Sequence, residues 1–325
     1  MNNLPEDILV NILLFLPLKS LLRFKSVSKK WRSIISDPHF ANFHFQSSSS
    51  LSHRLLHIVD SQVGSVDLDS SFFDRSAVFE LHLPNNVPPH EIWGSCRGFV
   101  LLHDFHSSNF IMLNPFTGSY RRFPNSPKPS ELCPFICGFG YDAYTDDYLV
   151  VQAANLTYDT DEFDVEFFSM KANSWTKIAD RTNFPYSNGY DQTIVGTFLN
   201  GAIHWLVGRR YASVQLLIRF NLRERNFMEM PLPDGFESGF HFSCLVTLGG
   251  CLSICKINDS DKTANIWSMK EYGVKSSWTK SFVLSLAYIP NRYFIPKGLT
   301  QSGEIVGSDE ATRVSSVSSQ AEQEK

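Results

Sequence analysis

The chain has 325 residues, of which 43% are hydrophobic and 19% are charged. This composition excludes a largely disordered protein and predicts about two domains of ~150 residues each. The net charge of −4 excludes the basic footprint of a nucleic-acid-binding protein. Aromatic residues reach 14%, led by 27 Phe, and they favour β-strands because their side chains suit a pleated, half-buried surface.

The apolar stretch from Ile8 to Leu18 is too short to span a bilayer, and Asn11 and Pro17 interrupt it. It also lacks the basic leader and the cleavage site of a signal peptide. Six Cys are too few for a disulfide framework in a chain of this length. We therefore expect reduced thiols, a cytoplasmic or nuclear location and no membrane partner.

The first 45 residues predict three short helices. The first begins near Pro5, with Asn3 as a possible cap, and ends before Pro17; the others cover about 19–25 and 28–36. The apolar stripe of the first helix is wide, so part of it is predicted to await a partner. Residues 1–40 carry a net charge of +3 and the remainder −7. The serine run at 47–50 is the predicted boundary.

The rest of the chain repeats one pattern of an apolar strand, a small polar residue, a turn and an aromatic residue. The polar residues lie at 114, 169, 221 and 268, in steps of 55, 52 and 47. A further strand is predicted before each segment, at 98–103, 148–153, 201–207 and 250–256, and Asn200-Gly201 is a tight-turn signal. Such a period predicts a kelch-like β-propeller, with a β-sandwich as the alternative.

The first 40 residues resemble an F-box. The matching segments are Leu4-Pro5-Glu6-Asp7-Ile8-Leu9, Ile12-Leu13, Leu16-Pro17, Leu21-Leu22-Arg23-Phe24 and Val27-Ser28-Lys29-Lys30-Trp31-Arg32. Members of that family often have Cys where Ser28 stands, and this departure should cost little because Ser has a similar shape.

The downstream repeats resemble the F-box-associated domain of plant F-box proteins, many of which are called F-box/kelch-repeat proteins and some of which are pollen S-locus proteins. The motifs are Gly94-Ser95-Cys96-Arg97-Gly98, Leu113-Asn114-Pro115, Gly138-Phe139-Gly140-Tyr141-Asp142, Asn200-Gly201-Ala202-Ile203-His204-Trp205 and the segment around Trp175.

This resemblance implies a fold and a role. The fold is a small all-α, three-helix F-box followed by an all-β propeller. The role is that of the substrate-recognition subunit of a Skp–cullin–F-box ubiquitin ligase, in which the F-box binds the Skp adaptor and the β domain holds a protein destined for ubiquitination and proteasomal degradation. Such a receptor is not an enzyme and uses no cofactor. The alternative is an F-box scaffold or target-sequestering protein that acts without a cullin.

The resemblance also implies the adaptor-binding residues. The candidates are the apolar F-box positions, of which some build the core and others contact the adaptor: Leu4, Pro5, Ile8, Leu9, Ile12, Leu16, Pro17, Leu21, Val27 and Trp31. Leu4 and Pro5 are the preferred contacts because they lie at the exposed helix start. The basic residues nearby suit an acidic adaptor and would speed docking.

The predicted domains are an F-box at 1–45, a Ser-rich linker at 46–54, a propeller-like domain at 55–307 and a disordered tail at 308–325. The segment from Gly298 to Val306 reads as the opening of a fifth repeat, but the tail has no aromatic residue and is rich in Ser, Glu and Gln. The last blade is therefore predicted to be incomplete.

Other chemistry is weakly indicated, and we predict no catalytic residue and no metal site. The CxxxC pairs Cys133/Cys137 and Cys251/Cys255 lack the partners of a zinc site and favour core residues. His103 and His106, near the end of a predicted strand, are predicted to be loop polar groups, and His204 is predicted to be a core or hydrogen-bonded residue. A propeller enzyme would need a clustered His/Tyr/Cys metal set, and the sequence shows none.

The target cannot be identified from the sequence. The acidic run at 159–164 lacks the order of a calcium loop and predicts a solvated hairpin. Five segments are candidate target-facing surfaces, at 85–90, 125–131, 159–164, 183–191 and 234–239.

Overall fold

The computed structural model divides the chain into two compact units, Met1–Ser52 and His53–Lys325. The boundary falls within the predicted linker. The structure describes residues 5–16, 18–37, 40, 43–44, 54–59, 62–67, 78–81, 90–104, 109–115, 119–124, 126, 135–155, 163–178, 186–187, 193–209, 214–234, 236, 243–258, 260–287, 294–300, 302–308 and 314–317.

The first unit is helical. Its helices are α1 (Glu6–Leu14), α2 (Leu18–Phe24) and α3 (Lys29–Ser36). Pro5 is the N-cap of α1, and Glu6 and Asp7 stand in its first turn, where acidic groups favour the positive helix end. Ser28 caps α3 by accepting a hydrogen bond from the Trp31 N–H at 3.1 Å.

The predicted number of three helices is too small for the described residues. After α3 the backbone is helical again at Phe40, Phe43 and His44. Asp37 ends α3 as its C-cap, and its carboxylate accepts a hydrogen bond from the Phe40 N–H at 3.2 Å.

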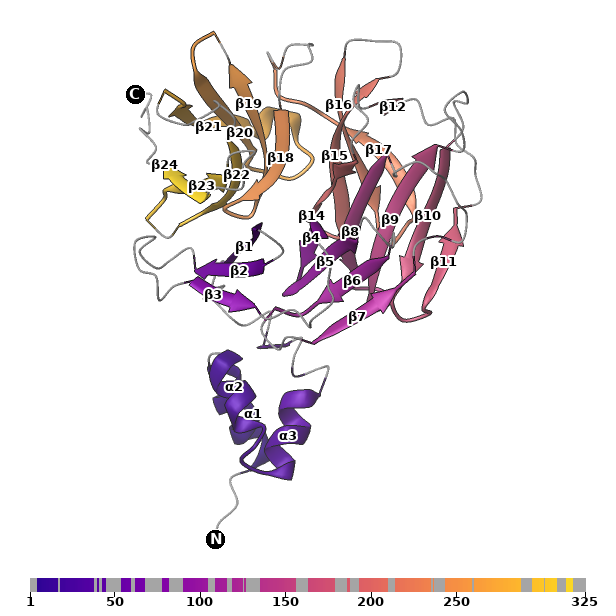
Figure 1. The fold of residues 1–325 in the computed structure, drawn as a ribbon, viewed down its shortest axis with the longest axis vertical. Helices are drawn as coiled ribbons and strands as arrows, with labels where there is room; N and C mark the ends of the chain where they lie inside the picture. The colour runs from indigo at the N-terminus through magenta and orange to yellow at the C-terminus, as the bar shows by residue number, and fades with distance from the viewer. Residues whose placement is uncertain are drawn as a thin grey trace. The chain divides into compact units, whose positions relative to one another are not determined.

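The second unit is all-β in its described residues and contains six sheets (Figure 1). A sandwich would have two sheets packed face to face, so this alternative does not fit. The three N-terminal strands are β1 (Arg54–Val59), β2 (Gln62–Asp67) and β3 (Val78–Leu81). The next two sheets contain β4 (His90–Cys96), β5 (Phe99–Asp104), β6 (Phe110–Leu113), β7 (Tyr120–Phe123), β8 (Ile136–Asp142), β9 (Asp147–Asn155), β10 (Phe163–Ser169) and β11 (Ser174–Lys177).

The fourth sheet has β15 (Ala202–Arg209), β16 (Gln215–Asn221) and β17 (Asn226–Met230) as its longer strands. Two short strands, β12 (Tyr186–Ser187) and β14 (Thr197–Leu199), pair with β15 at its edge. The short strand β13 (Ile194–Val195) instead joins β8 in the preceding sheet. The fifth contains β18 (Ser243–Leu248), β19 (Cys251–Asn258), β20 (Thr263–Met269) and β21 (Trp278–Ser285), with the 3-10 helix η2 (Lys275–Ser277) before β21. The sixth contains β22 (Ile295–Leu299), β23 (Ile305–Ser308) and β24 (Val314–Val317).

The predicted repeat corresponds to the antiparallel sheets. In each of the four, the predicted first strand and the apolar segment pair as neighbours, and the aromatic residue lies in the strand after them, as Trp175 does in β11. Asn200 and Gly201 form the tight turn before β15, both with positive φ (49° and 71°). The kelch type of these sheets stays a prediction.

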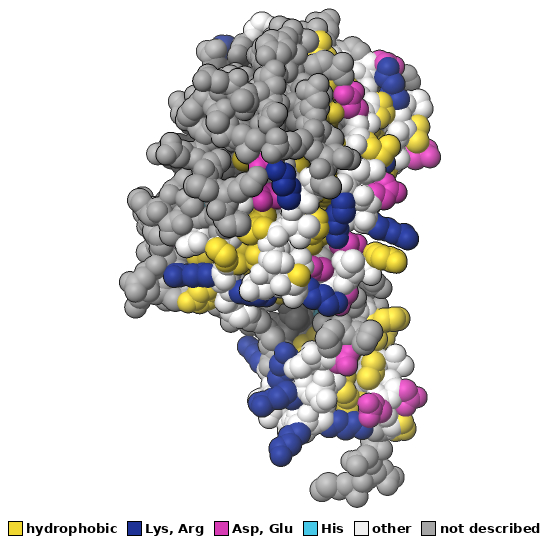
Figure 2. Space-filling model, turned by 90° about the vertical axis from the view of Figure 1, so that its right-hand side faces the viewer, with side chains coloured by type: hydrophobic (Ala, Val, Ile, Leu, Met, Phe, Trp, Pro, Cys, Tyr) yellow, Lys and Arg dark blue, Asp and Glu magenta, His cyan; other side chains and the backbone are white. Residues whose placement is uncertain are grey.

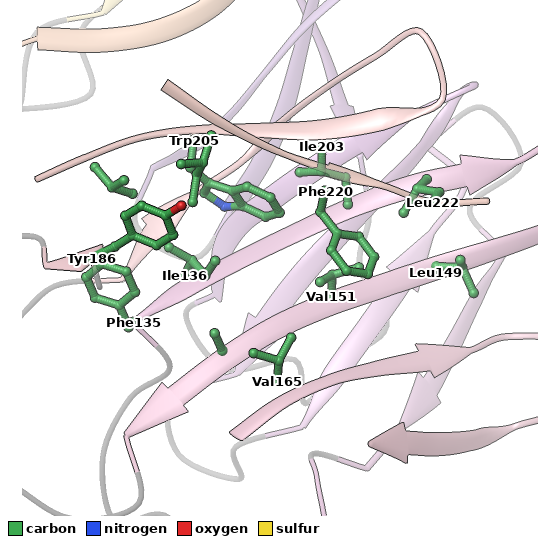
Figure 3. Packing of buried hydrophobic residues seen from close by; sticks show 13 residues of the cluster. Phe135, Ile136, Leu149, Val151, Val165, Tyr186, Ile203, Trp205, Phe220 and Leu222 are labelled. Atoms are coloured by element: carbon green, nitrogen blue, oxygen red, sulfur yellow. The ribbon is translucent and has the colours of Figure 1, made fainter. Parts of the chain in front are cut away.

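Neighbouring sheets pack through apolar side chains. The largest cluster joins β8, β9 and β10 to β15 and β16, and Figure 3 shows Ile136 and Val151 on one side of this junction and Trp205 and Phe220 on the other. Gly138 lets the two sheets approach closely, because an added Cβ would lie 2.4 Å from Ile203 Cγ2 and 2.8 Å from Trp205 Cζ2.

Two tryptophans connect consecutive sheets in the same way. Trp175 Nε1–H donates to the Pro124 carbonyl at 3.0 Å, and Trp278 Nε1–H donates to the Pro231 carbonyl at 2.9 Å. Each proline follows the last strand of the preceding sheet. In these two repeats the aromatic residue therefore connects its own sheet to the one before it.

The prediction of a disordered tail from 308 is wrong for part of that segment. Val314–Val317 form β24, which pairs antiparallel with Ile305–Ser308 of β23. The polar composition suggested disorder, but strand pairing uses backbone groups that composition does not report. The predicted fifth repeat thus has a third strand, although no aromatic residue follows.

Candidate functional site

The first helix places apolar side chains on two different faces. Leu9 and Leu13 are buried, whereas Ile8 and Ile12 are 44% and 46% exposed and Phe15, just after α1, is 90% exposed. Residues 8, 12 and 15 follow the i, i+4, i+7 spacing of one helical face. The exposed face is therefore a continuous apolar row, which we call the α1 row.

The opposite face of α1 forms the core of the helical unit. That core contains Leu9, Leu13, Leu21, Ile34, Ile35 and Phe40, with Leu16, Phe24 and Trp31 packed against it. Leu9 and Leu21 were among the predicted adaptor contacts, but they are only 5% and 2% exposed. They are therefore among the candidates that build the core, because a side chain without exposed surface has nothing to offer a partner.

The other predicted contacts divide by exposure. Pro5 and Val27 are exposed, and Leu16 and Trp31 are partly buried. The Trp31 ring packs edge-on against Phe24 with a centroid distance of 5.3 Å. The predictions for Leu4 and Pro17 lie outside the described residues.

Two exposed aromatic residues were not among the predicted contacts. Phe15 is 90% and Phe43 is 63% exposed. The helical spacing of Phe15 from Ile8 and Ile12 was visible in the sequence and could have identified it. Phe43 had no such signal, because it lies beyond the region where the sequence predicted a helix.

Charged residues surround the apolar surface of the helical unit. Figure 2 shows hydrophobic and acidic side chains on one side of this unit and most Lys and Arg side chains on the other. Lys30 Nζ lies 3.2 Å from Glu6 Oε2, and both side chains are exposed. Such a surface pair contributes little to stability.

The predictions for His204, His103 and His106 have different outcomes in the β unit. His204 is fully buried as predicted: its Nδ1 lies 3.1 Å from the Thr197 carbonyl and its Nε2 lies 2.7 Å from Tyr272 Oη. Burial lowers the pKa of His204 to about 4. His103 is not a loop residue, because it lies in β5, is buried and stacks on Trp93 at a centroid distance of 3.9 Å. His106 lies outside the described residues.

The cysteines of the β unit are free thiols in the described residues. Cys137 and Cys255 are buried, and burial raises the pKa of the Cys137 thiol well above its ordinary value. Cys251 is partly buried at the start of β19, and Cys133 lies outside the described residues. No group of three or more His, Cys, Asp or Glu residues that could hold a metal ion occurs in the described part of the chain.

The predicted target-facing segments fall mostly outside the described residues. Of the acidic run, Asp164 is described: it lies in β10, is buried and pairs with Lys177. This position corrects the prediction of a solvated hairpin for Asp164. Over the described ranges, no helix is long and apolar enough to cross a membrane.

The comparisons with known families match both units. Residues 1–43 match the F-box domain, and residues 25–317 match the F-box associated beta propeller domain. In Arabidopsis thaliana, F-box protein CPR1 is 29% identical over 314 residues, covering 87% of this chain and 73% of that protein. F-box/kelch-repeat protein At3g23880 is 28% identical over 295 residues, covering 86% of this chain and 79% of that protein.

Solved structures resemble the chain less closely. TolB from Acinetobacter baumannii is 8% identical, covers 82% of this chain and 63% of its own, and has a TM-score of 0.45. A likeness at this level is too low to identify a fold.

Proposed function

This chain belongs to the family of F-box proteins with an F-box associated β-propeller domain, and we propose that it is the substrate-recognition subunit of a Skp–cullin–F-box ubiquitin ligase. In this proposal the helical unit binds the Skp adaptor, which attaches to the cullin. The β unit binds the protein to be ubiquitinated and degraded. The place of action would be the cytoplasm, the nucleus or both.

The observation that carries the proposal is the α1 row. Three large apolar side chains, Ile8, Ile12 and Phe15, face away from the core of their own unit. Exposing them to water is unfavourable in an isolated protein, and contiguous exposed apolar surface marks protein interaction sites. Pro5, one turn before Ile8, is also exposed and extends the candidate surface toward the start of the helix.

The proposed receptor performs no covalent step. It would hold a target near the ubiquitin-loaded conjugating enzyme and so raise the effective concentration of the target's lysines at the thioester. This role requires neither a cofactor nor a catalytic residue in the chain.

The alternative is a cullin-independent scaffold, which an incomplete last repeat would favour. β24 pairs along β23 and adds a third strand to that repeat, which weakens this reason. The ligase subunit is therefore the function that we propose.

The test is co-purification of the full chain with a plant Skp adaptor and a cullin. We expect wild type to retain both proteins and an Ile8→Asp/Ile12→Asp variant to retain neither, since two carboxylates would be desolvated in the interface. The matched control is Val214→Asp, because Val214 is similarly exposed at 42% but lies in the β unit.

Each outcome bears on a different part of the proposal. A folded wild type that fails to bind the adaptor would refute it. Adaptor binding without cullin recruitment would favour the scaffold. Equal adaptor binding by wild type and the double variant would show that the α1 row is not the contact surface.

A further inference from the structure

Turns from two sheets and a strand of a third meet at one place on the β unit. Arg223 lies in the turn after β16, and its Cζ is 4.6 Å from the centroid of the Tyr144 ring. Tyr144 belongs to the turn after β8. Lys171 Nζ, in the turn after β10, donates to the Thr145 carbonyl at 3.2 Å. Arg121 of β7 donates to the Met170 carbonyl at 3.0 Å and to Asn173 Oδ1 at 2.8 Å. We call Arg121, Tyr144, Lys171 and Arg223 the turn cluster.

The turns that carry the cluster are held by their own hydrogen bonds. The Asp142 carboxylate accepts from the Tyr144 N–H at 3.0 Å, from the Thr145 hydroxyl at 2.8 Å and from the Arg225 guanidinium at 2.9 Å. The Asp147 carboxylate accepts from the Ser169 hydroxyl and from the Lys171 N–H. A partner would therefore meet a preorganised surface, which lowers the entropy cost of binding.

The cations of the turn cluster are paired with neutral groups. Among the described residues, Arg121, Lys171 and Arg223 make no ion pair, and their contacts are carbonyls, an amide oxygen and an aromatic ring. The nearby carboxylates of Asp142 and Asp147 are buried and used within the turns. Two exposed carboxylates remain, those of Asp146 and Glu224, and the Asp146 carboxylate accepts from the Tyr141 hydroxyl.

These cations lie in a unit whose net charge is negative. Residues 53–325 carry a net charge of −7, yet the exposed cations at this site retain their capacity to pair with carboxylates. A guanidinium can bind a carboxylate with two parallel hydrogen bonds. Desolvation by a docked partner would strengthen that interaction, because screening by water is reduced.

Tyr144 adds an apolar anchor to the cations. Its side chain is 73% exposed, although its turn is held by hydrogen bonds from Tyr144 and Thr145 to the Asp142 carboxylate. Tyr and Arg are enriched among the residues that dominate binding energy at interfaces. Stacking of Arg223 on Tyr144 presents both groups together.

We propose that the turn cluster binds an acidic, Asp- and Glu-rich segment of a partner protein. As a site for the target this rests on the proposed function, but the binding itself requires neither adaptor nor cullin. The site differs from the described part of the acidic run, because Asp164 pairs with Ala154 near the end of β9, whereas the cluster lies beside Asp147, where β9 begins.

The experiment measures binding of the full chain to a fluorescently labelled Glu-rich dodecapeptide by fluorescence anisotropy. We expect the peptide to bind more weakly as salt is raised. A Lys171→Glu/Arg223→Glu variant should bind about tenfold more weakly, and Tyr144→Ala about fivefold more weakly. The control is Lys270→Glu/Lys275→Glu, which makes the same change in net charge at exposed positions of the turn between β20 and β21. The dissociation constant of this control for the peptide should be within about twofold of the wild-type value.

Three results would overturn the proposal. They are equal loss of binding in the control, equal binding of a Gln-rich peptide of the same length, and tighter binding of a single-stranded DNA oligonucleotide of matched charge through the same residues. A wild-type urea midpoint of the Lys171→Glu/Arg223→Glu variant shows that its β unit, which carries both substitutions, is folded. Adaptor co-purification by this variant, which depends on the helical unit, separates a failure here from a failure of the proposed ligase function.

Discussion

Truncation of Phe15 to Ala gives the sharpest test of the α1 row. A Phe side chain buries 150–250 Å² when it is fully covered, and Phe15 is 90% exposed, so about 180 Å² is available to an adaptor. Phe15→Ala would remove on the order of 100 Å² of that contact. At ~25 cal/mol per Å² this is about 2.5 kcal/mol, or about 60-fold in the dissociation constant.

The same change should leave the fold intact. A side chain this exposed contributes little to the core, so the free energy of unfolding should change by less than about 0.5 kcal/mol. Leu13→Ala is the opposite case: Leu13 is 0% exposed, and its truncation should lower the free energy of unfolding by about 2–5 kcal/mol.

Titration calorimetry with the adaptor and urea denaturation would measure both quantities. The reasoning would be refuted if Phe15→Ala bound the adaptor as tightly as wild type. It would also be refuted if the substitution destabilised the chain as much as Leu13→Ala does.

Two further substitutions test the β unit. Gly138→Ala should lower the free energy of unfolding by about 2 kcal/mol, because the new Cβ would lie 2.4 Å from Ile203 Cγ2 and 2.8 Å from Trp205 Cζ2. Gly201→Ala meets no atom within 4 Å at φ +71° and should cost only about 1 kcal/mol of backbone strain; equal costs in urea denaturation would contradict the close-packing argument. The third prediction concerns pH. Burial holds the pKa of His204 at about 4, below its ordinary 6.5, so the unfolded chain binds a proton that the folded chain does not, and stability should fall as pH decreases from 6.5 toward 4. His204→Gln should show a shallower fall over this range in denaturation at pH 7 and pH 5, and an unchanged slope would exclude His204 as its source.

The elements whose patterns are local were predicted well. The Asn200-Gly201 turn follows from the φ preferences of those two residues, and both have positive φ. The repeat of apolar strand, polar residue and aromatic residue predicted paired strands because each unit is formed by neighbours in sequence. The F-box motif was recognisable for the same reason, and its family match covers residues 1–43.

The candidate site was predicted only in part. The apolar positions of α1 were visible, but Leu9 and Ile8 are adjacent and similar in hydrophobicity, and one is buried while the other is exposed. Which face turns inward depends on where the other helices pack, and that is a property of the assembled unit. His103 was placed in a loop for a similar reason, since stacking on Trp93 depends on the pairing of β4 with β5.

The sequence by itself determined the first three helices, the strands of the four repeats, the Asn200-Gly201 turn and the family, because these depend on short-range conformational preferences and on motifs. Tertiary structure alone decided which face of α1 is exposed, that Val314–Val317 pair with β23, and that Arg121, Tyr144, Lys171 and Arg223 come together. The first and last residues of that cluster are about a hundred positions apart in the chain. Such contacts form between sheets that pack on each other, and local preferences contain no information about which turns will then become neighbours.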